Sequence, residues 1–134
     1  MTERRLRGLL DTCVVIDLPQ LDLGRLPVEA AVSSIVLAEL AQGVAMAKDP
    51  VQMLARAQRL ADTEAEFASI PFDREAARRF GTLVALTLQA KRDPRPRRMD
   101  LMIAATAAAH GLPLFTRNAD DFKGLEAGVE IVEV

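Results

Sequence analysis

Acidic residues recur at the places in this sequence where the chain should leave a strand or enter a helix. Asp11 follows Leu9 and Leu10 in the stretch GLLDTCVVID, so it interrupts an apolar run typical of a strand that is buried on both faces. A carboxylate there needs a partner, a metal ion or a position at the end of the strand. The other acids of this kind are Glu39, Asp100 and the adjacent pair Asp120 and Asp121.

Converging carboxylates would have a specific chemistry. Two of them 4 Å apart repel by about 4 kcal/mol at an effective dielectric constant near 20. A cluster is therefore costly unless a cation lies within it, and hard oxygen ligands favour Mg²⁺ or Mn²⁺. Such an ion activates water and stabilises a phosphoryl transition state. Taken singly, the acids also have structural explanations: the helix dipole favours Asp100, and Asp121 could cap a helix.

The elements that must position these acids alternate along the chain. Apolar runs predict strands at residues 6–10, 31–33, 66–70, 112–116 and 129–134. Helices are expected at residues 12–18, 35–47, 50–66, 74–90 and 99–110, with Ser34 and Asp73 as N-caps. This alternation predicts one α/β domain over residues 1–134, with a short, mostly parallel central sheet flanked by helices. The acids then fall at the carboxyl ends of the strands, where such sheets bind ligands.

Composition restricts the classes of protein that remain. Half of the 134 residues are hydrophobic, as in a globular protein, and no run is long enough to cross a bilayer, so a cytoplasmic protein without a membrane partner is expected. The net charge of −2 argues against a general nucleic-acid coat, and the lack of Trp and Tyr argues against base stacking. Cys13, the single cysteine, permits no internal disulfide and is expected to be a small buried side chain.

Four stretches carry a resemblance to a known family: LLDTCVVID, AVSSIVLAELAQGV, RRMDLMIAATAAAHGLPLFTRNADDF and the closing VEIVEV. Together they resemble the PIN-domain ribonucleases, specifically the VapC toxins of bacterial toxin–antitoxin pairs. The resemblance implies a three-layer PIN-like fold and an endoribonuclease toxin that depends on Mg²⁺ or Mn²⁺. It also implies an RNA substrate such as a tRNA or a ribosomal RNA, inhibition by a VapB-type antitoxin, and a homodimer.

The same resemblance assigns roles residue by residue. The first acid of the family falls on Asp11, the helix glutamate on Glu39 and the third acid on Asp100. The fourth falls on Asp121, with Asn118 as the alternative position. Hydroxyls beside the metal cluster fall on Thr12 and Thr116, and each could fix the orientation of a carboxylate.

A basic, proline-rich segment, KRDPRPRR, precedes Asp100 and is not part of the general family pattern. Positive side chains could hold an RNA backbone through its phosphates. The candidate RNA contacts are Arg92, Arg95, Arg97, Arg98 and, beyond the segment, Arg117. The alternative is a solvated charged loop.

Two successive helices, between Ile35 and about Ala61, carry more apolar positions than one buried face requires. The surplus, in which Val44 and Leu54 are the positions singled out, predicts either a groove for a partner helix or a homodimer seam.

Rival interpretations fit less well. A haloacid-dehalogenase phosphatase needs a second Asp where Cys13 stands, and a response-regulator receiver needs a Lys that FTRN does not contain. The alternatives that stay open are a catalytically idle PIN-like binding protein and another Mg²⁺-binding α/β domain.

Overall fold

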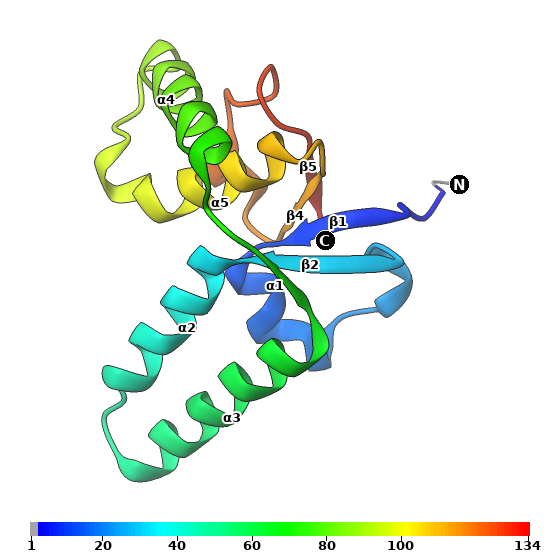
Figure 1. The fold of residues 1–134 in the computed structure, drawn as a ribbon, viewed down its shortest axis with the longest axis vertical. Helices are drawn as coiled ribbons and strands as arrows, with labels where there is room; N and C mark the ends of the chain where they lie inside the picture. Colours follow the sequence, from blue (N-terminus) through cyan, green and yellow to red (C-terminus); the bar gives the residue numbers. More distant parts are fainter. Residues whose placement is uncertain (1–2) are drawn as a thin grey trace.

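Five short parallel strands form the centre of the computed structural model, which describes residues 3–134 (Figure 1). The strands are β1 (Arg7–Leu10), β2 (Glu29–Ser33), β3 (Ala68–Ile70), β4 (Leu114–Thr116) and β5 (Ile131–Glu133). Their order is β3-β2-β1-β4-β5, and all four pairings are parallel. The expected α/β architecture is confirmed, and the sheet is wholly rather than mostly parallel.

Helices flank this sheet on both sides. They are α1 (Thr12–Asp17), α2 (Ser34–Ala45), α3 (Pro50–Glu66), α4 (Arg74–Gln89) and α5 (Arg98–Ala109), and shorter 3-10 turns are η1 (Leu18–Gln20), η2 (Leu23–Arg25), η3 (Arg95–Arg97) and η4 (Ala119–Phe122). From β1 the chain adds β2 and β3 in one direction, then crosses to add β4 and β5 in the other. Right-handed connections therefore put α1, α2 and α3 on one face and α4 and α5 on the other (Figure 1).

The point where the strand order reverses lies between β1 and β4. Ligands of open parallel sheets bind outside the carboxyl ends of the strands at such a point. Asp11 follows β1 directly, and Thr116 is the last residue of β4. The topology alone thus brings these two residues to the same edge of the sheet.

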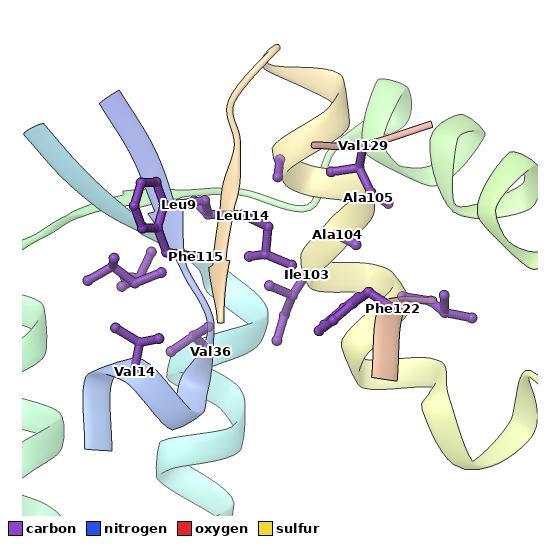
Figure 2. Close-up of a cluster of buried hydrophobic side chains, with 14 of the residues drawn as sticks. Leu9, Val14, Val36, Ile103, Ala104, Ala105, Leu114, Phe115, Phe122 and Val129 are labelled. Atoms are coloured by element: carbon purple, nitrogen blue, oxygen red, sulfur yellow. The ribbon is translucent and has the colours of Figure 1, made fainter. Parts of the chain in front are cut away.

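Apolar packing fixes β1 and β4 against each other. Leu9 and Leu114 are register partners and are fully buried, as is Phe115 on the same strand (Figure 2). Gly8 makes room for this aromatic ring, since a Cβ there would lie 2.4 Å from Cε1 of Phe115. Ile103 of α5 closes the cluster from the other face, so helix and strands hold one another in place.

One predicted cap is wrong. Ser34 was expected to cap the second long helix, but the cap is Ser33, whose hydroxyl accepts hydrogen bonds from the amides of Ile35 and Val36. An N-cap needs extended backbone, and Ser33 has it as the last residue of β2. The hydroxyl of Ser34 instead accepts the amide of Phe72. Asp73 caps α4 as predicted.

The helices α2 and α3 form a hairpin that projects from the body of the sheet (Figure 1). Their predicted apolar surplus is present, because Met46, Val51 and Leu54 are all exposed. Val44 is half-buried. Among the described residues, no helix combines the length and the apolar character needed to span a membrane.

Candidate active site

Asp11 is the most buried of the predicted acids, with 5% of its surface exposed. It caps α1, and its Oδ1 accepts the amide of Thr12 at 2.9 Å. Its Oδ2 accepts the hydroxyl of Thr116 at 2.8 Å, a contact between the ends of two neighbouring strands. The carboxylate is therefore fixed in orientation by groups from two elements.

Glu39 lies in the second turn of α2 and is half-buried. Its Oε1 accepts the hydroxyl of Thr12 at 2.8 Å, so one threonine contacts Asp11 through its amide and Glu39 through its side chain. Burial raises the pKa of Glu39 above its usual value; the hydrogen bond from Thr12 opposes this rise, and the charge of Asp11 adds to it.

Asp100 lies in the first turn of α5. Its pKa is raised from 3.8 to about 6, chiefly by burial and then by the charges of Asp11, Glu39 and Asp121, whereas Arg97 opposes the rise. A carboxyl group can respond to three other carboxylates only when all of them lie within electrostatic range. The three acids that act on Asp100 therefore lie in its neighbourhood, although they come from distant parts of the chain.

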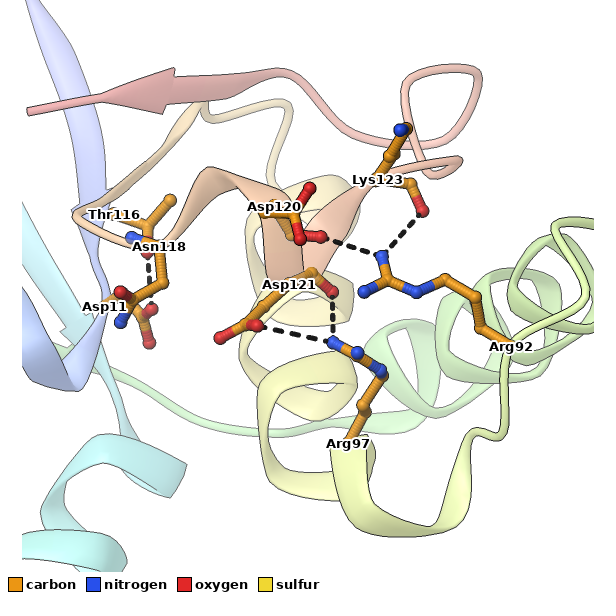
Figure 3. Close-up of polar contacts among 8 residues, drawn as sticks. All are labelled: Asp11, Arg92, Arg97, Thr116, Asn118, Asp120, Asp121 and Lys123. Carbon is orange, nitrogen blue, oxygen red and sulfur yellow. Dashed lines mark hydrogen bonds and ion pairs between the residues drawn. The ribbon is translucent and has the colours of Figure 1, made fainter.

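The two candidates for the fourth acidic position are arranged differently. Asp121 belongs to η4, and its side-chain Oδ1 lies 3.5 Å from a guanidinium nitrogen of Arg97 (Figure 3). Asn118 precedes this turn and is exposed, and its backbone N–H donates to the hydroxyl of Thr116 at 3.0 Å. The charge of Asp121 reaches Asp100, whereas Asn118 carries no charge and lies beside Thr116. The two candidates therefore approach the site from different sides.

The donor set suits a hard divalent cation. The four carboxylates offer the oxygen ligands that such an ion prefers. Arg97 is the positively charged side chain that lowers the pKa of Asp100. Within residues 3–134, no three side chains of His, Cys, Asp or Glu already stand at the spacing that holds a metal ion. A bound cation would have to draw the carboxylates together against their mutual repulsion.

Cys13 lies closer to these acids than the sequence led us to expect. Its Sγ donates to Oδ2 of Asp11 at 3.4 Å, lies 3.5 Å from the hydroxyl of Thr116, and accepts the amide of Arg117. Burial and then the charge of Asp11 raise the pKa of the thiol. The side chain is half-buried rather than buried. Its position two residues after Asp11, in the first turn of α1, was the signal that could have located it.

The structure divides the candidate RNA contacts. Arg92 and Arg97 turn inward and donate to backbone carbonyls of residues 120–123 (Figure 3). Arg95 has 86% of its side chain exposed, and Arg98 is also exposed. Arg117 pairs with Asp17 of α1 at 2.9 Å. Only part of the basic segment therefore faces solvent freely.

Comparisons with known proteins show the family to which the chain belongs. The model of the PIN domain family matches residues 9–127, a range that includes all four acids. The chain is 41% identical over 135 aligned residues to Ribonuclease VapC5 of Mycobacterium tuberculosis, with 95% of each chain covered.

Solved structures show the same fold over nearly the whole length. VapBC-5 from Mycobacterium tuberculosis contains a chain with a TM-score of 0.85 and 36% identity, matched over 96% of this chain and 99% of that one. VapBC2 from Rickettsia felis, bound to a DNA fragment from its promoter, gives a TM-score of 0.78 at 24% identity, over 96% and 98% of the two chains. The second match supports the fold alone.

Proposed function

Because this chain belongs to the PIN-domain family and is similar to VapC toxins, we propose that it is a single-domain endoribonuclease toxin that hydrolyses RNA phosphodiesters with Mg²⁺ or Mn²⁺. The observation that carries the proposal is the hydrogen-bonded group of Asp11, Glu39 and two threonines at one edge of the sheet, where burial and nearby carboxylates also raise the pKa of Asp100. The curated relative, named a ribonuclease, supports the substrate class.

In this proposal the four acids Asp11, Glu39, Asp100 and Asp121 hold the ion. When bound, the ion supplies Lewis-acid catalysis to the water and to the phosphoryl oxygens. Thr12 and Thr116 orient two of the carboxylates through their hydroxyls. Asn118 is held beside Thr116 by its backbone N–H, and we assign its side chain the role of offering an amide oxygen or holding a water.

Proton transfer falls to a carboxylate, since His110, the only histidine, is the exposed C-cap of α5. One of the four carboxylates serves as this base, and the bound cation would set its pKa. Water then attacks the phosphorus in line, and the bond to the 3′-oxygen breaks as that oxygen leaves and takes up a proton. The ribose 2′-hydroxyl takes no part, so the products carry 5′-phosphate and 3′-hydroxyl ends.

A cleavage assay tests the proposal against a PIN-like protein that only binds a partner. The purified chain, free of antitoxin, should cut structured RNA when Mn²⁺ is added and should stop when EDTA removes the ion. Mapping the 5′ ends of fragments after induced expression would identify the RNA, with tRNA and ribosomal RNA as the expected classes. RNA that stays intact at every Mn²⁺ concentration would favour the binding protein.

Control of such an enzyme requires an inhibitor. Relatives are solved as VapBC toxin–antitoxin assemblies, which supports a VapB-type antitoxin as the partner of this chain. The exposed apolar residues of the α2–α3 hairpin offer a surface for an antitoxin helix, and a cationic side chain beyond it could pair with the carboxylate of Glu39. The same hairpin surface is the candidate for a homodimer seam.

We place the complex of this chain with its antitoxin in the cytoplasm, where the RNA substrate is.

Leu54 is the sharpest probe of that surface, because 73% of it is exposed. Leu54→Asp should weaken antitoxin binding by about tenfold, as for loss of an apolar anchor at an interface, and leave RNA cleavage intact. Val44→Asp is a poorer test, since a half-buried position risks the fold. Pull-down with the antitoxin and a cleavage assay measure the two effects, and size-exclusion chromatography detects loss of a dimer.

Leu88→Asp is the matched control, because Leu88 is also an exposed leucine, 58% accessible, but lies on α4. It should bind the antitoxin as the unmodified chain does. A Leu54→Asp protein that is folded, active and still fully inhibited would exclude the hairpin as the antitoxin site.

A further inference from the structure

Two arginines of the basic segment converge on the turn that carries Asp121 (Figure 3). Arg92 follows α4, and its Nη1 donates to the carbonyl of Asp120 at 2.7 Å and to that of Lys123 at 3.4 Å. Both contacts are to the backbone, so they act on the path of the chain and not on a side chain. Arg92 thus connects the end of α4 to both ends of the turn.

Arg97 contacts the same turn between those two points. Its Nη1 donates to the carbonyl of Asp121 at 3.0 Å and lies 3.5 Å from Oδ1 of the same residue. Its side chain is 24% exposed, whereas that of Arg95, two residues earlier, is 86% exposed. One nitrogen of Arg97 thus serves both the carbonyl and a carboxylate oxygen of Asp121.

The turn needs such support because it is short. η4 spans four residues, and 3-10 turns of this length have weak internal hydrogen bonds. Two such hydrogen bonds hold this turn. The backbone N–H of Asp121 donates to the carbonyl of Asn118, and that of Lys123 donates to the carbonyl of Asp120. Phe122 anchors the turn in the core, but a buried ring alone does not fix the direction of the adjacent carboxylate.

We propose that Arg92 and Arg97 are positioning residues that clamp η4 and hold the carboxylate of Asp121 beside Asp11, Glu39 and Asp100. The RNA contacts of the basic segment then fall to Arg95 and Arg98, which are exposed. The role of the clamp in metal binding rests on the proposed function. The contacts that form the clamp involve protein atoms alone.

Arg92 provides the cleaner test, because it contacts only backbone atoms and its charge is absent from the causes that shift the pKa of Asp100. In Arg92→Ala, Mn²⁺ binding measured by calorimetry should weaken about tenfold, in line with the loss of outer-shell support at metal sites. RNA affinity measured without divalent ions should stay unchanged. Arg95→Ala, a matched loss of one arginine, should leave Mn²⁺ affinity unchanged and weaken RNA affinity. Equal Mn²⁺ affinity in Arg92→Ala and the unmodified chain would overturn the clamp.

A double-mutant cycle separates positioning from a general loss of structure. If Arg92 acts through Asp121, Arg92→Ala should cause no further loss of Mn²⁺ affinity in an Asp121→Asn background. The same tenfold loss in that background would contradict the inference. Should Arg92→Ala fail to fold, Arg92→Lys serves, since it keeps the charge but not the shape of the guanidinium, and we expect a smaller loss.

Amide hydrogen exchange measures the stability of η4 without any metal ion. It therefore tests the clamp separately from the proposed ribonuclease function. The amides of Asp121 and Lys123 should exchange at least severalfold faster in Arg92→Ala, while that of Leu9 in the core stays protected. Unchanged exchange at both positions would overturn the clamp whatever the metal does. An unmodified chain that neither binds Mn²⁺ nor cuts RNA would overturn the proposed function instead.

Discussion

Asp11→Asn should reduce RNA cleavage by at least about a hundredfold, because loss of a ligand should cost more than loss of its outer partners, which already costs 10- to 100-fold. Asn keeps the size of Asp and one oxygen for the amide of Thr12. Its amide nitrogen can donate to the hydroxyl of Thr116, so both cap and strand contact survive. A steady-state assay with a labelled RNA and saturating Mn²⁺ measures the loss.

Asp120→Asn is the matched control for charge. Asp120 is exposed and uses its backbone carbonyl, not its side chain, to contact Arg92. This variant should cleave RNA as the unmodified chain does, and both variants should melt cooperatively. Full activity in Asp11→Asn would mean that the carboxylate cluster is not the catalytic site.

The second large effect concerns the stability of the metal-free chain against pH. Asp100 has a folded-state pKa of about 6 against an ordinary value of 3.8, so between these values the folded chain binds more protons than the unfolded chain. Stability should therefore fall as pH rises from about 4 to 6 and stay lower above pH 6. A shift of this size corresponds to at most about 3 kcal/mol, and partial exposure reduces it to about 1–2 kcal/mol.

Asp100→Asn removes the group that titrates and should thus raise the free energy of unfolding by this amount at pH 7.5, with little gain at pH 4. Urea unfolding at the two pH values in the presence of EDTA measures it, with Asp120→Asn as the control. Mn²⁺ should stabilise the unmodified chain more than the variant, because an ion that binds the folded state shifts the equilibrium by mass action. A variant that is less stable at pH 7.5 would show that Asp100 is a structural residue.

Much of the fold could be predicted from sequence because it depends on regular patterns, and the same patterns indicate which acids lie at the edge of the sheet. Alternating strands and helices require a parallel sheet, and its topology places Asp11 and Thr116 at the same edge. How Asp121 and Asn118 lie relative to the other acids depends on the path of η4, which no periodicity describes.

Other features could not be predicted because they depend on which way individual side chains turn. The basic segment is uniform in sequence, yet Arg92 and Arg97 bind backbone carbonyls while Arg95 faces solvent. Cys13 was expected to be a small buried side chain, but the first turn of α1 brings its sulfur into contact with Asp11. Such contacts join residues that are either nearly adjacent or far apart in the chain, and neither spacing gives a periodic signal.

The chemistry of the RNA ends tests the central claim, that four carboxylates direct hydrolysis by water, most directly. Fragments produced by the purified chain with Mn²⁺ would be analysed for their termini by mass spectrometry and by ligation that requires a 5′-phosphate. The account predicts 5′-phosphate and 3′-hydroxyl ends, and no cut in Asp11→Asn. Fragments ending in a 2′,3′-cyclic phosphate would contradict it, because they arise only when the ribose hydroxyl is the nucleophile.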